Sequence, residues 1–575
     1  MRSIPLLLAT SVAALMLATT DPAAAQTVST PFTLSSGTPR TPEQLAMRFD
    51  LADLAIKVLP EEKAIDAVAA LTFTATAPLE ALVVELDARF ALTSIQIDGI
   101  EIDDEHWSNP DGRLTIRLTR PLSTGQSATL RIAYGGQPHE ASNAPWDGGF
   151  VWAKTPDGRP WIGTALQGEG CDLFWPCIDH PQGEPARVDL HITAPSDLSA
   201  PSNGRFLGKI DNGDGTTTWN WTAAHPDTYA VALNVGPYVE LTAPYPSRFG
   251  NTVPLHFWRL DSDRPERAAA LFAEFPKMLD FYEATVGPFP FGDEKMGVVE
   301  TPYLGMEHQT INAYGNAYKL DGKGYDWLLQ HELAHEWFGN QMTNGSWDDM
   351  WLHEGLGSYM QPLYARWLHG DRYMETELTA MRLTLANRFP LVSGQPQDAA
   401  AVDTEATGPG LDMYYKGALV AHSLRLLIGD EAFFRSLTRL IYGRSDPRPG
   451  NFQPRYATTP DFIAIVSDEA GRDMRWFFDA YVYQAALPDL VQTREGDRVT
   501  LHWQTAGGAF PMPVEVEIDG RLRTFDMREG TARFDAPPTA HILIDPANKV
   551  LRRLDFIDAY HARQIEDRLP PRPNY

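Results

Sequence analysis

Apolar and polar residues alternate in short segments between residues 40 and 240. Residues 114–118, 130–134 and 188–192 show the pattern, with a large apolar side chain at every second position. Successive side chains of a strand point to opposite faces of a sheet, so a period of two predicts strands with one buried face. Turn-forming residues such as Asp111-Gly112 separate these segments. We therefore expect a β-rich N-terminal domain.

The spacing of apolar residues changes near residue 264 and becomes helical up to about residue 484. Helices are predicted over residues 268–282, 325–341, 347–367, 416–428 and 461–483. Alternation returns after Pro488, and Asp519-Gly520 is typical of a hairpin turn between two short strands.

The chain has 575 residues, more than one hydrophobic core usually serves, so we expect several domains. The predicted class is multidomain α+β. The predicted parts are an N-terminal β domain (26–240), a mostly helical domain (241–487), a small β-sandwich (488–560) and a loose, proline-rich tail (561–575).

Acidic residues outnumber basic ones, 75 against 48, which gives a formal net charge of −27. Nucleic acids and anionic membrane surfaces attract positive protein surfaces, so neither is an expected partner. The sequence does not indicate an oligomeric state.

Residues 1–25 have the pattern of a secretory signal peptide. Arg2 precedes an apolar run over residues 4–18, and three alanines at residues 23–25 form a small-residue cleavage site. The run is short for a membrane span, and no cysteine near the cleavage site indicates a lipid anchor. We expect the mature protein to begin near Gln26, in the periplasm or outside the cell.

The two cysteines of the chain, Cys171 and Cys177, lie six residues apart. In an oxidising compartment they can form a disulfide that closes a small loop. The alternative, two buried small apolar side chains, is equally favoured by the sequence.

One short segment has the spacing of a metal site. Residues 331–335 read His-Glu-Leu-Ala-His, and on a helix this spacing puts His331 and His335 on one face, about one turn apart. A catalytic zinc needs three protein ligands and one open position. Glu354, 19 positions after His335 on the next predicted helix, is the expected third ligand. Glu332 is offset from the two imidazoles and is the candidate to face a metal-bound water.

Two alternatives accompany this hypothesis. The five-residue motif alone arises by accident in roughly a few per hundred chains of this size, and the second glutamate lowers that chance more than about tenfold. His353 can compete with Glu354 as a ligand, but one helical step turns it by about 100°. We expect His353 to face a packing environment of its own.

The sequence HELAHEWFGN followed by WLHEG resembles the aminopeptidase N family of gluzincin metallopeptidases, which includes the leukotriene-A hydrolases. The resemblance implies one Zn²⁺ per chain, hydrolysis of peptide bonds and peptide substrates with a free N-terminus. It also implies a saddle-like β domain, a thermolysin-like catalytic domain over residues 241–487 and a β-sandwich. The large C-terminal helical domain of many relatives is not expected here, which suggests a more open cleft.

Residues 304–308, Leu-Gly-Met-Glu-His, resemble the family's GxMEN motif and depart from it at Leu304 and His308. The resemblance assigns Gly305, Met306 and Glu307 to substrate binding, with Glu307 on the α-ammonium group. A buried ammonium needs a fixed negative partner, which agrees with that role. The alternative is a glutamate in a surface loop.

Two further segments resemble family motifs. Residues 414–417, Tyr-Tyr-Lys-Gly, resemble YxKG, which implies that Tyr414 stabilises the oxyanion and that Tyr415 is the variable position. Each tyrosine can alternatively be a core aromatic. Gln167, in the run Gln-Gly-Glu-Gly, matches the position that helps to bind the substrate amine.

These assignments predict a secreted zinc aminopeptidase in which zinc polarises the scissile carbonyl and lowers the pKa of its water. Glu332 acts as general base and Tyr414 steadies the oxyanion. The nearest rival is a zinc endopeptidase with the same metal site. A second rival is a binding module with a structural zinc, and an epoxide hydrolase activity follows by family analogy alone.

Overall fold

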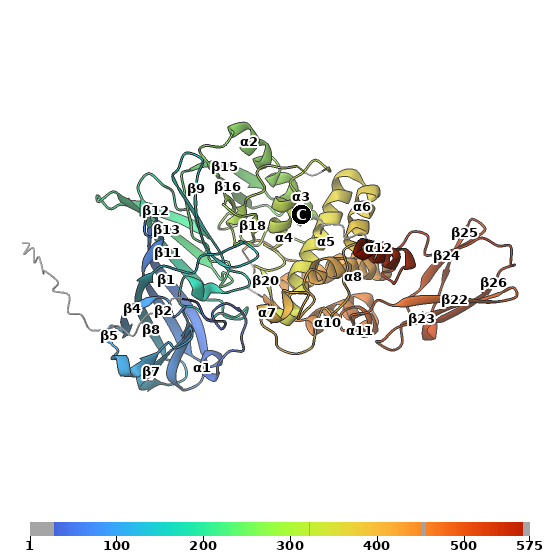
Figure 1. Cartoon of the computed structure of the whole chain (residues 1–575), viewed down its shortest axis with the longest axis horizontal. Coiled ribbons are helices and arrows are strands. Elements are labelled where there is room, and N and C mark those ends of the chain that lie inside the picture. The colour runs from blue at the N-terminus through green and yellow to red at the C-terminus, as the bar shows by residue number, and fades with distance from the viewer. Residues whose placement is uncertain (1–27, 321, 451, 453–454, 567–575) are drawn as a thin grey trace, which may run out of the picture.

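The computed structural model describes residues 28–320, 322–450, 452 and 455–566. Three parts follow one another along the molecule: a set of sheets, a mostly helical middle and two small C-terminal sheets (Figure 1). This arrangement confirms the predicted multidomain α+β class. The predicted signal segment lies outside the described residues. Within them, no helix has both the length and the apolar character that a membrane crossing requires.

An eight-stranded sheet is the framework of the N-terminal part. In spatial order its strands are β12 (Arg205–Asp211), β13 (Thr216–Ala224), β11 (Arg187–Pro195), β1 (Met47–Leu59), β2 (Ala64–Ala75), β8 (Ser127–Gly136), β4 (Ala91–Ile97) and β5 (Ile100–Glu101). Strands β1 and β11 run parallel, with Leu54 opposite Leu190. In β8 the side chains of Leu130, Ile132 and Tyr134 are buried, as the alternation of residues predicted.

Two smaller sheets and, besides the 3₁₀ turn η2 (Cys171–Leu173), two short helical segments complete the N-terminal part. The sheets contain β3 (Leu79–Glu85), β7 (Arg113–Leu122) and β6 (Trp107–Ser108), and β14 (Asn234–Val235), β10 (Pro160–Ala165) and β9 (Gly149–Lys154). The helical segments are α1 (Pro42–Leu45) and the 3₁₀ turn η1 (Asp104–His106).

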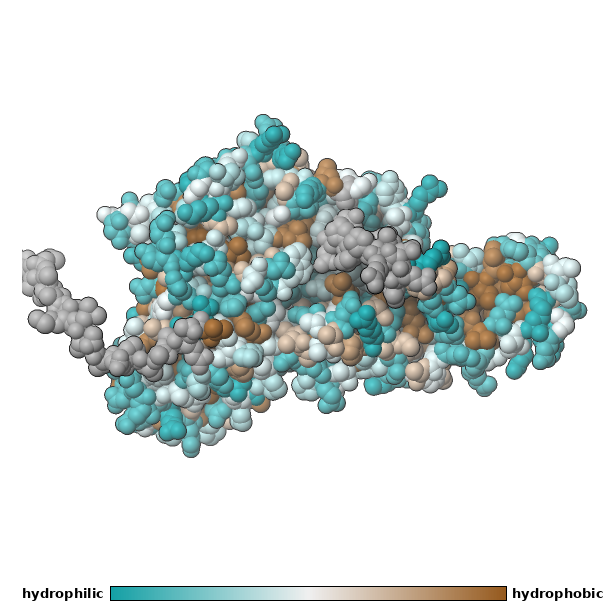
Figure 2. Space-filling model, in the orientation of Figure 1, coloured by the Kyte–Doolittle hydropathy of each residue, from teal (hydrophilic) through white to brown (hydrophobic). Residues whose placement is uncertain are grey.

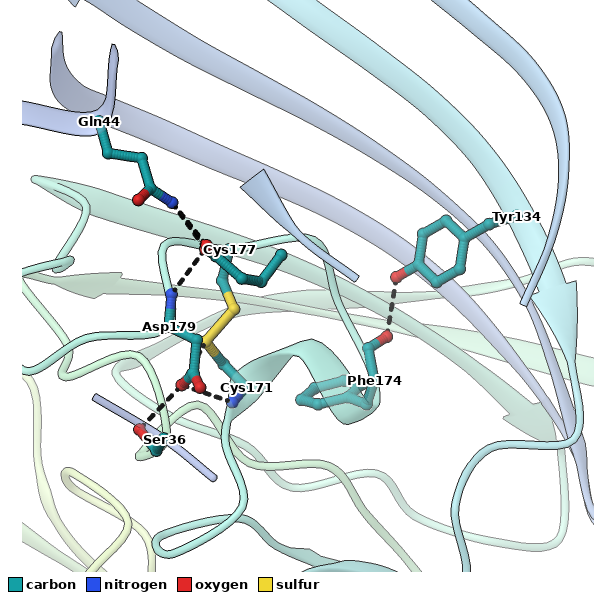
Figure 3. The surroundings of a disulfide bond; sticks show 8 residues. Ser36, Gln44, Tyr134, Cys171, Phe174, Cys177 and Asp179 are labelled. Carbon is teal, nitrogen blue, oxygen red and sulfur yellow. Dashed lines mark hydrogen bonds between the residues drawn. A yellow bond between two sulfur atoms is a disulfide. The ribbon is translucent and has the colours of Figure 1, made fainter. Parts of the chain in front are cut away.

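A disulfide joins Cys171 and Cys177, so the structure selects pairing over two free thiols. Cys171 begins the 3₁₀ turn η2 (Cys171–Leu173), which follows β10. Figure 3 shows Asp179 beside the disulfide, where its carboxylate accepts hydrogen bonds from Ser36 Oγ (3.0 Å) and the Cys171 N–H (3.3 Å). The cross-link and these bonds hold the chain segment that immediately follows Gln167.

The middle part contains a five-stranded mixed sheet with helices against it. In spatial order the strands are β15 (Tyr238–Pro246), β16 (Thr252–Leu260), β17 (Met296–Glu300), β19 (Asn312–Tyr314) and β18 (Gly305–Met306). The edge strand β18 pairs antiparallel with β19, with Gly305 opposite Tyr314. Glu307 therefore leaves the sheet at its edge.

The helices of the middle part surround a large apolar core. They are α2 (Pro265–Phe272), α3 (Phe275–Thr285), α4 (Trp327–Ala334), η3 (Trp347–Asp349), α5 (Trp351–His369), α6 (Asp371–Arg382), α7 (Ala399–Val402), α8 (Asp412–Ile428), α9 (Asp430–Tyr442), α10 (Thr459–Ala470) and α11 (Arg475–Tyr481). A short parallel pair, β20 (Met342–Asn344) and β21 (Arg455–Ala457), lies beside them. Helices α5 and α8 meet at Gly355 and Gly417, where a Cβ on Gly355 would lie 2.8 Å from the Gly417 Cα. Two glycines thus permit this close contact.

Three predicted helical segments are shorter or divided in the structure. Residues 268–282 form two helices, and Pro276 lies in the first turn of the second, where its missing N–H is tolerated. The segment 325–341 ends as a helix at Ala334, and Gly339 then takes a backbone φ of 143°. The segment 461–483 is divided at Gly471, whose φ of 64° caps α10.

The C-terminal part consists of two three-stranded sheets, in the orders β22 (Asp489–Glu495), β23 (Arg498–Gln504), β26 (Thr531–Asp535) and β25 (Arg521–Phe525), β24 (Val514–Ile518), β27 (Ile542–Ile544). The 3₁₀ turn η4 (Arg528–Gly530) precedes β26. Asp519 and Gly520 both have positive φ and form the predicted hairpin turn. Figure 2 shows apolar side chains gathered on the surface of this part. Its exposed large apolar side chains include Leu522 and Leu543.

The tail was predicted to be loose from residue 561, and the structure has helix α12 (Asp555–Glu566) across that boundary. Asp555 and Asp558 in its first turn suit the positive end of a helix dipole. His561 Nε2 donates a hydrogen bond to the Leu383 carbonyl (2.9 Å), which ties the helix to the middle part. Residues 567–575 lie outside the described residues.

Candidate active site

Two helices bring the three predicted metal ligands together. His331 lies in the last turn of α4, which begins with Asp326 as its N-cap, and His335 caps the C-terminal end of that helix. Their Nε2 atoms are 3.3 Å apart. Glu354 lies in the first turn of α5, and its Oε2 is 3.4 Å from His335 Nε2 and 3.9 Å from His331 Nε2.

These donors suit a tetrahedral zinc ion. Ligand atoms about 2 Å from such an ion lie about 3.3 Å from one another, close to the distances observed here. His335 Nδ1 donates to the Phe338 carbonyl (3.0 Å), which leaves Nε2 as the nitrogen with a free lone pair. Glu354 Oε2 is buried and has no hydrogen-bond partner among the described residues. A bound cation would satisfy both atoms.

Glu332 points from α4 toward the edge strand β18. A Cβ on Gly305 would lie only 2.2 Å from Glu332 Oε1, so the carboxylate is in close contact with the glycine backbone. Burial, followed by the nearby carboxylates of Glu307 and Glu354, raises the pKa of Glu332 well above its usual range. Three buried carboxylates in one place repel one another, and a divalent cation offsets that repulsion.

Glu307 is the centre of a second group next to the metal ligands. Its Oε1 accepts hydrogen bonds from Gln167 Nε2 (2.6 Å) and from the Tyr229 hydroxyl (2.6 Å). Gln167 Nε2 also lies 3.3 Å from Glu354 Oε1. Glu307 is buried, so the surface-loop alternative does not describe it. The N-terminal part thus contributes directly to the group around the metal ligands.

The predicted substrate residues Gly305 and Met306 form β18 and are buried beside Glu307. The neighbouring His308 is fully buried, and neither ring nitrogen has a hydrogen-bond partner among the described residues. Burial lowers the pKa of His308 to about 3, so the ring is neutral. The departure from the family motif therefore adds no positive charge next to Glu307.

Tyr414, and not Tyr415, faces the metal ligands. The Tyr414 ring centroid is 6.4 Å from that of His331. Burial, followed by the Glu354 carboxylate, raises the pKa of Tyr414, whereas burial alone raises that of Tyr415. The hydroxyl of Tyr414 is thus protonated and can donate a hydrogen bond.

Comparison with known proteins agrees with this geometry. Residues 295–481 match the Peptidase family M1 domain, and residues 49–229 match the Peptidase M1 N-terminal domain. The chain belongs to peptidase family M1. Both matches contain residues of the site: Gln167 and Tyr229 lie in the first segment, and the metal ligands lie in the second.

Sequence relatives of this family M1 chain include probable aminopeptidase 2 of Sulfurisphaera tokodaii, 22% identical over 494 residues (78% of this chain and 57% of the relative). Leucine aminopeptidase 2 of Vanderwaltozyma polyspora is 25% identical over 306 residues (50% of this chain and 43% of the relative). The chain thus spans about half the length of these relatives. A solved M1 zinc metallopeptidase mutant of Deinococcus radiodurans, bound to a Tyr-Ser-Ala substrate, matches with a TM-score of 0.64 and 25% identity, covering 79% of this chain and 98% of that one.

The family M1 site also includes residues that the sequence analysis did not assign to it. Tyr229 lies between β13 and β14 in an apolar run without any polar spacing pattern. His353 was expected to face a packing environment, and it lies between the His335 ring, 4.5 Å away between centroids, and the Tyr229 hydroxyl. Asn340 Nδ2 donates to the Glu307 carbonyl (3.0 Å). His353 and Asn340 lie within recognised motifs, WLHEG and HELAHEWFGN, whereas Tyr229 lies in none of the motifs considered.

Proposed function

We propose that this chain is a zinc aminopeptidase that hydrolyses the N-terminal peptide bond of peptides. The observation that carries the proposal is the short distance between two groups of the site. Ligand atoms of Glu307, Glu332 and His335 all lie within 4.8 Å of one another. The α-ammonium nitrogen and the carbonyl carbon of one residue are separated by a single Cα. A carboxylate so close to the metal ligands therefore leaves room for one residue between a bound amine and the scissile bond.

His331, His335 and Glu354 would hold one zinc ion per chain. When bound, zinc supplies Lewis acidity, which polarises a carbonyl and makes a water molecule more acidic. Nitrogen ligands from two histidines favour zinc over magnesium or calcium, which prefer oxygen.

Glu332, Tyr414 and Glu307 each have a separate role in the reaction. Glu332 takes a proton from the attacking water and passes it to the nitrogen of the leaving amine. Tyr414 donates a hydrogen bond to the carbonyl oxygen as negative charge develops there. Glu307, held by Gln167, accepts hydrogen bonds from the substrate ammonium and so selects the first peptide bond.

The proposal extends to location and partners. The substrates are peptides with a free N-terminus, and the net charge of −27 does not favour nucleic acid. Secretion is supported by the signal pattern of residues 1–25. It is also supported by the disulfide of Cys171 and Cys177, a bond typical of oxidising compartments.

Hydrolysis of a panel of aminoacyl aryl amides by the wild type, Glu332→Gln and Glu307→Ala tests the proposal. Glu332→Gln should retain zinc and lose about 10²–10⁴-fold in kcat, because it removes the general base alone. Glu307→Ala should mainly raise KM for substrates with a free amine. N-acetylated peptides test the endopeptidase rival: efficient internal cleavage of blocked peptides by the wild type would refute the aminopeptidase assignment.

A further inference from the structure

Tyr229 connects the Glu307 carboxylate to a third histidine near the metal ligands. The tyrosine hydroxyl lies 2.6 Å from Glu307 Oε1 and 3.0 Å from His353 Nε2. Both Tyr229 and His353 are buried. The tyrosine comes from the N-terminal part and the histidine from α5 of the middle part.

The direction of these hydrogen bonds follows from the groups involved. The Tyr229 hydroxyl donates its proton to Glu307 Oε1. The hydroxyl oxygen then accepts, and His353 must carry its proton on Nε2. His353 Nδ1 is left without a proton and, among the described residues, has no hydrogen-bond partner. The bonds therefore run from His353 through Tyr229 to Glu307.

The backbone around His353 is shaped to hold its ring. On one side the ring lies against that of His335, with 4.5 Å between centroids. On another side lies Gly339, where a Cβ would be 2.4 Å from His353 Nε2. The φ of 143° at Gly339 also disfavours any other residue. The ring thus has little freedom to turn away from Tyr229.

Glu307, His353 and Glu354 also form a group whose ligand atoms lie close enough to hold a cation. The hydrogen bonds argue against a second metal ion there. His353 Nε2 is a donor to Tyr229, and a protonated nitrogen cannot bind a metal. Glu307 Oε1 already accepts from both Gln167 and Tyr229.

We infer that Tyr229 and His353 are positioning residues for the amine of the substrate: they hold the Glu307 carboxylate ready for the ammonium group. This inference rests on the proposed function. Two donors on Oε1 fix the carboxylate plane before substrate binds, which lowers the cost of ordering it later. Substitution of Tyr229 or His353 should therefore weaken the binding of ligands with a free amine and leave the zinc content unchanged.

The test compares the affinities of L-leucine hydroxamate and its des-amino counterpart, 4-methylpentanohydroxamic acid, by calorimetry. The Kd of the des-amino compound divided by the Kd of L-leucine hydroxamate measures what the amine contributes to binding. Tyr229→Phe should reduce this ratio about tenfold, the usual effect of losing one hydrogen bond to a charged group. His353→Leu should reduce it as well, while His353→Gln, which can still donate, should restore most of it. Zinc per chain, measured by mass spectrometry, should be the same in all variants.

Tyr134→Phe is the matched control, since it removes another buried tyrosine hydroxyl, whose hydrogen bond is to the Phe174 carbonyl (2.9 Å) and not to a residue of the site. It should leave the ratio unchanged. If Tyr229→Phe weakened the binding of both ligands by the same factor, the inference would be overturned. Loss of the zinc ion from His353→Leu would also overturn it. A wild type that binds both ligands equally would instead refute the proposed role of Glu307. Were Tyr229→Phe not to fold, the His353→Leu and His353→Gln pair would decide the question.

Discussion

A single methyl group on β18 should displace Glu332, the proposed general base. In Gly305→Ala the new Cβ would lie 2.2 Å from Glu332 Oε1 and 2.7 Å from Leu328 Cδ1. Ordinary contact begins at 3.4 Å, so the carboxylate oxygen or the strand must move by 3.4 − 2.2 = 1.2 Å. A misplacement of about 1 Å in a reacting group costs about 100-fold in rate. We therefore expect kcat to fall about 100-fold.

The assay is steady-state hydrolysis of an aminoacyl aryl amide, together with zinc content and the melting temperature. Zinc content should not change, because the methyl group meets Glu332 and Leu328 and none of the three metal ligands. Gly322→Ala is the control, since a Cβ there has no atom within 4 Å. A folded, zinc-loaded Gly305→Ala with kcat within about threefold of the wild type would refute the need for this carboxylate position.

Three further predictions concern the metal, the packing of helices and the pH dependence of stability. Removal of the metal with 1,10-phenanthroline should abolish hydrolysis, and Zn²⁺ but not Mg²⁺ should restore it; undiminished activity of the metal-free protein would exclude the metal mechanism. Gly417→Ala should force α8 away from Gly355 and lower the free energy of unfolding by about 1–3 kcal/mol in urea titrations. An unchanged urea midpoint would show that the two helices separate without cost. Burial raises the pKa of Glu300 from 4.5 to about 9. The contribution of its neutral form to the free energy of unfolding is therefore fully present below pH 4.5 and is lost as the pH rises through 9. Glu300→Gln should flatten that decline in urea unfolding between about pH 5 and pH 9, and a parallel decline in both proteins would contradict the assignment.

Local geometry made much of the metal group predictable from the sequence. An α-helix has 3.6 residues per turn, so the four-residue spacing of His331 and His335 places both imidazoles on one face in any fold. The alternation of apolar residues likewise predicted strands such as β8, because the pleat of a strand is also a local property. The need of a catalytic zinc for a third ligand pointed to Glu354 on the next predicted helix, and the family resemblance added Tyr414 as a candidate.

The surroundings of Glu307 were decided by the tertiary structure. Its partners Gln167 and Tyr229 are 140 and 78 positions away in the chain. They meet because the N-terminal sheets pack against the middle part, and no local pattern encodes that packing. The sequence also left open whether Tyr414 faces the site or the core, because that depends on how α8 packs against α4. It left the pairing of Cys171 with Cys177 open as well, because spacing alone does not show whether two thiols meet in the fold. Backbone geometry repeats along a segment and can be read from spacing, whereas contacts between distant segments depend on how whole surfaces fit together.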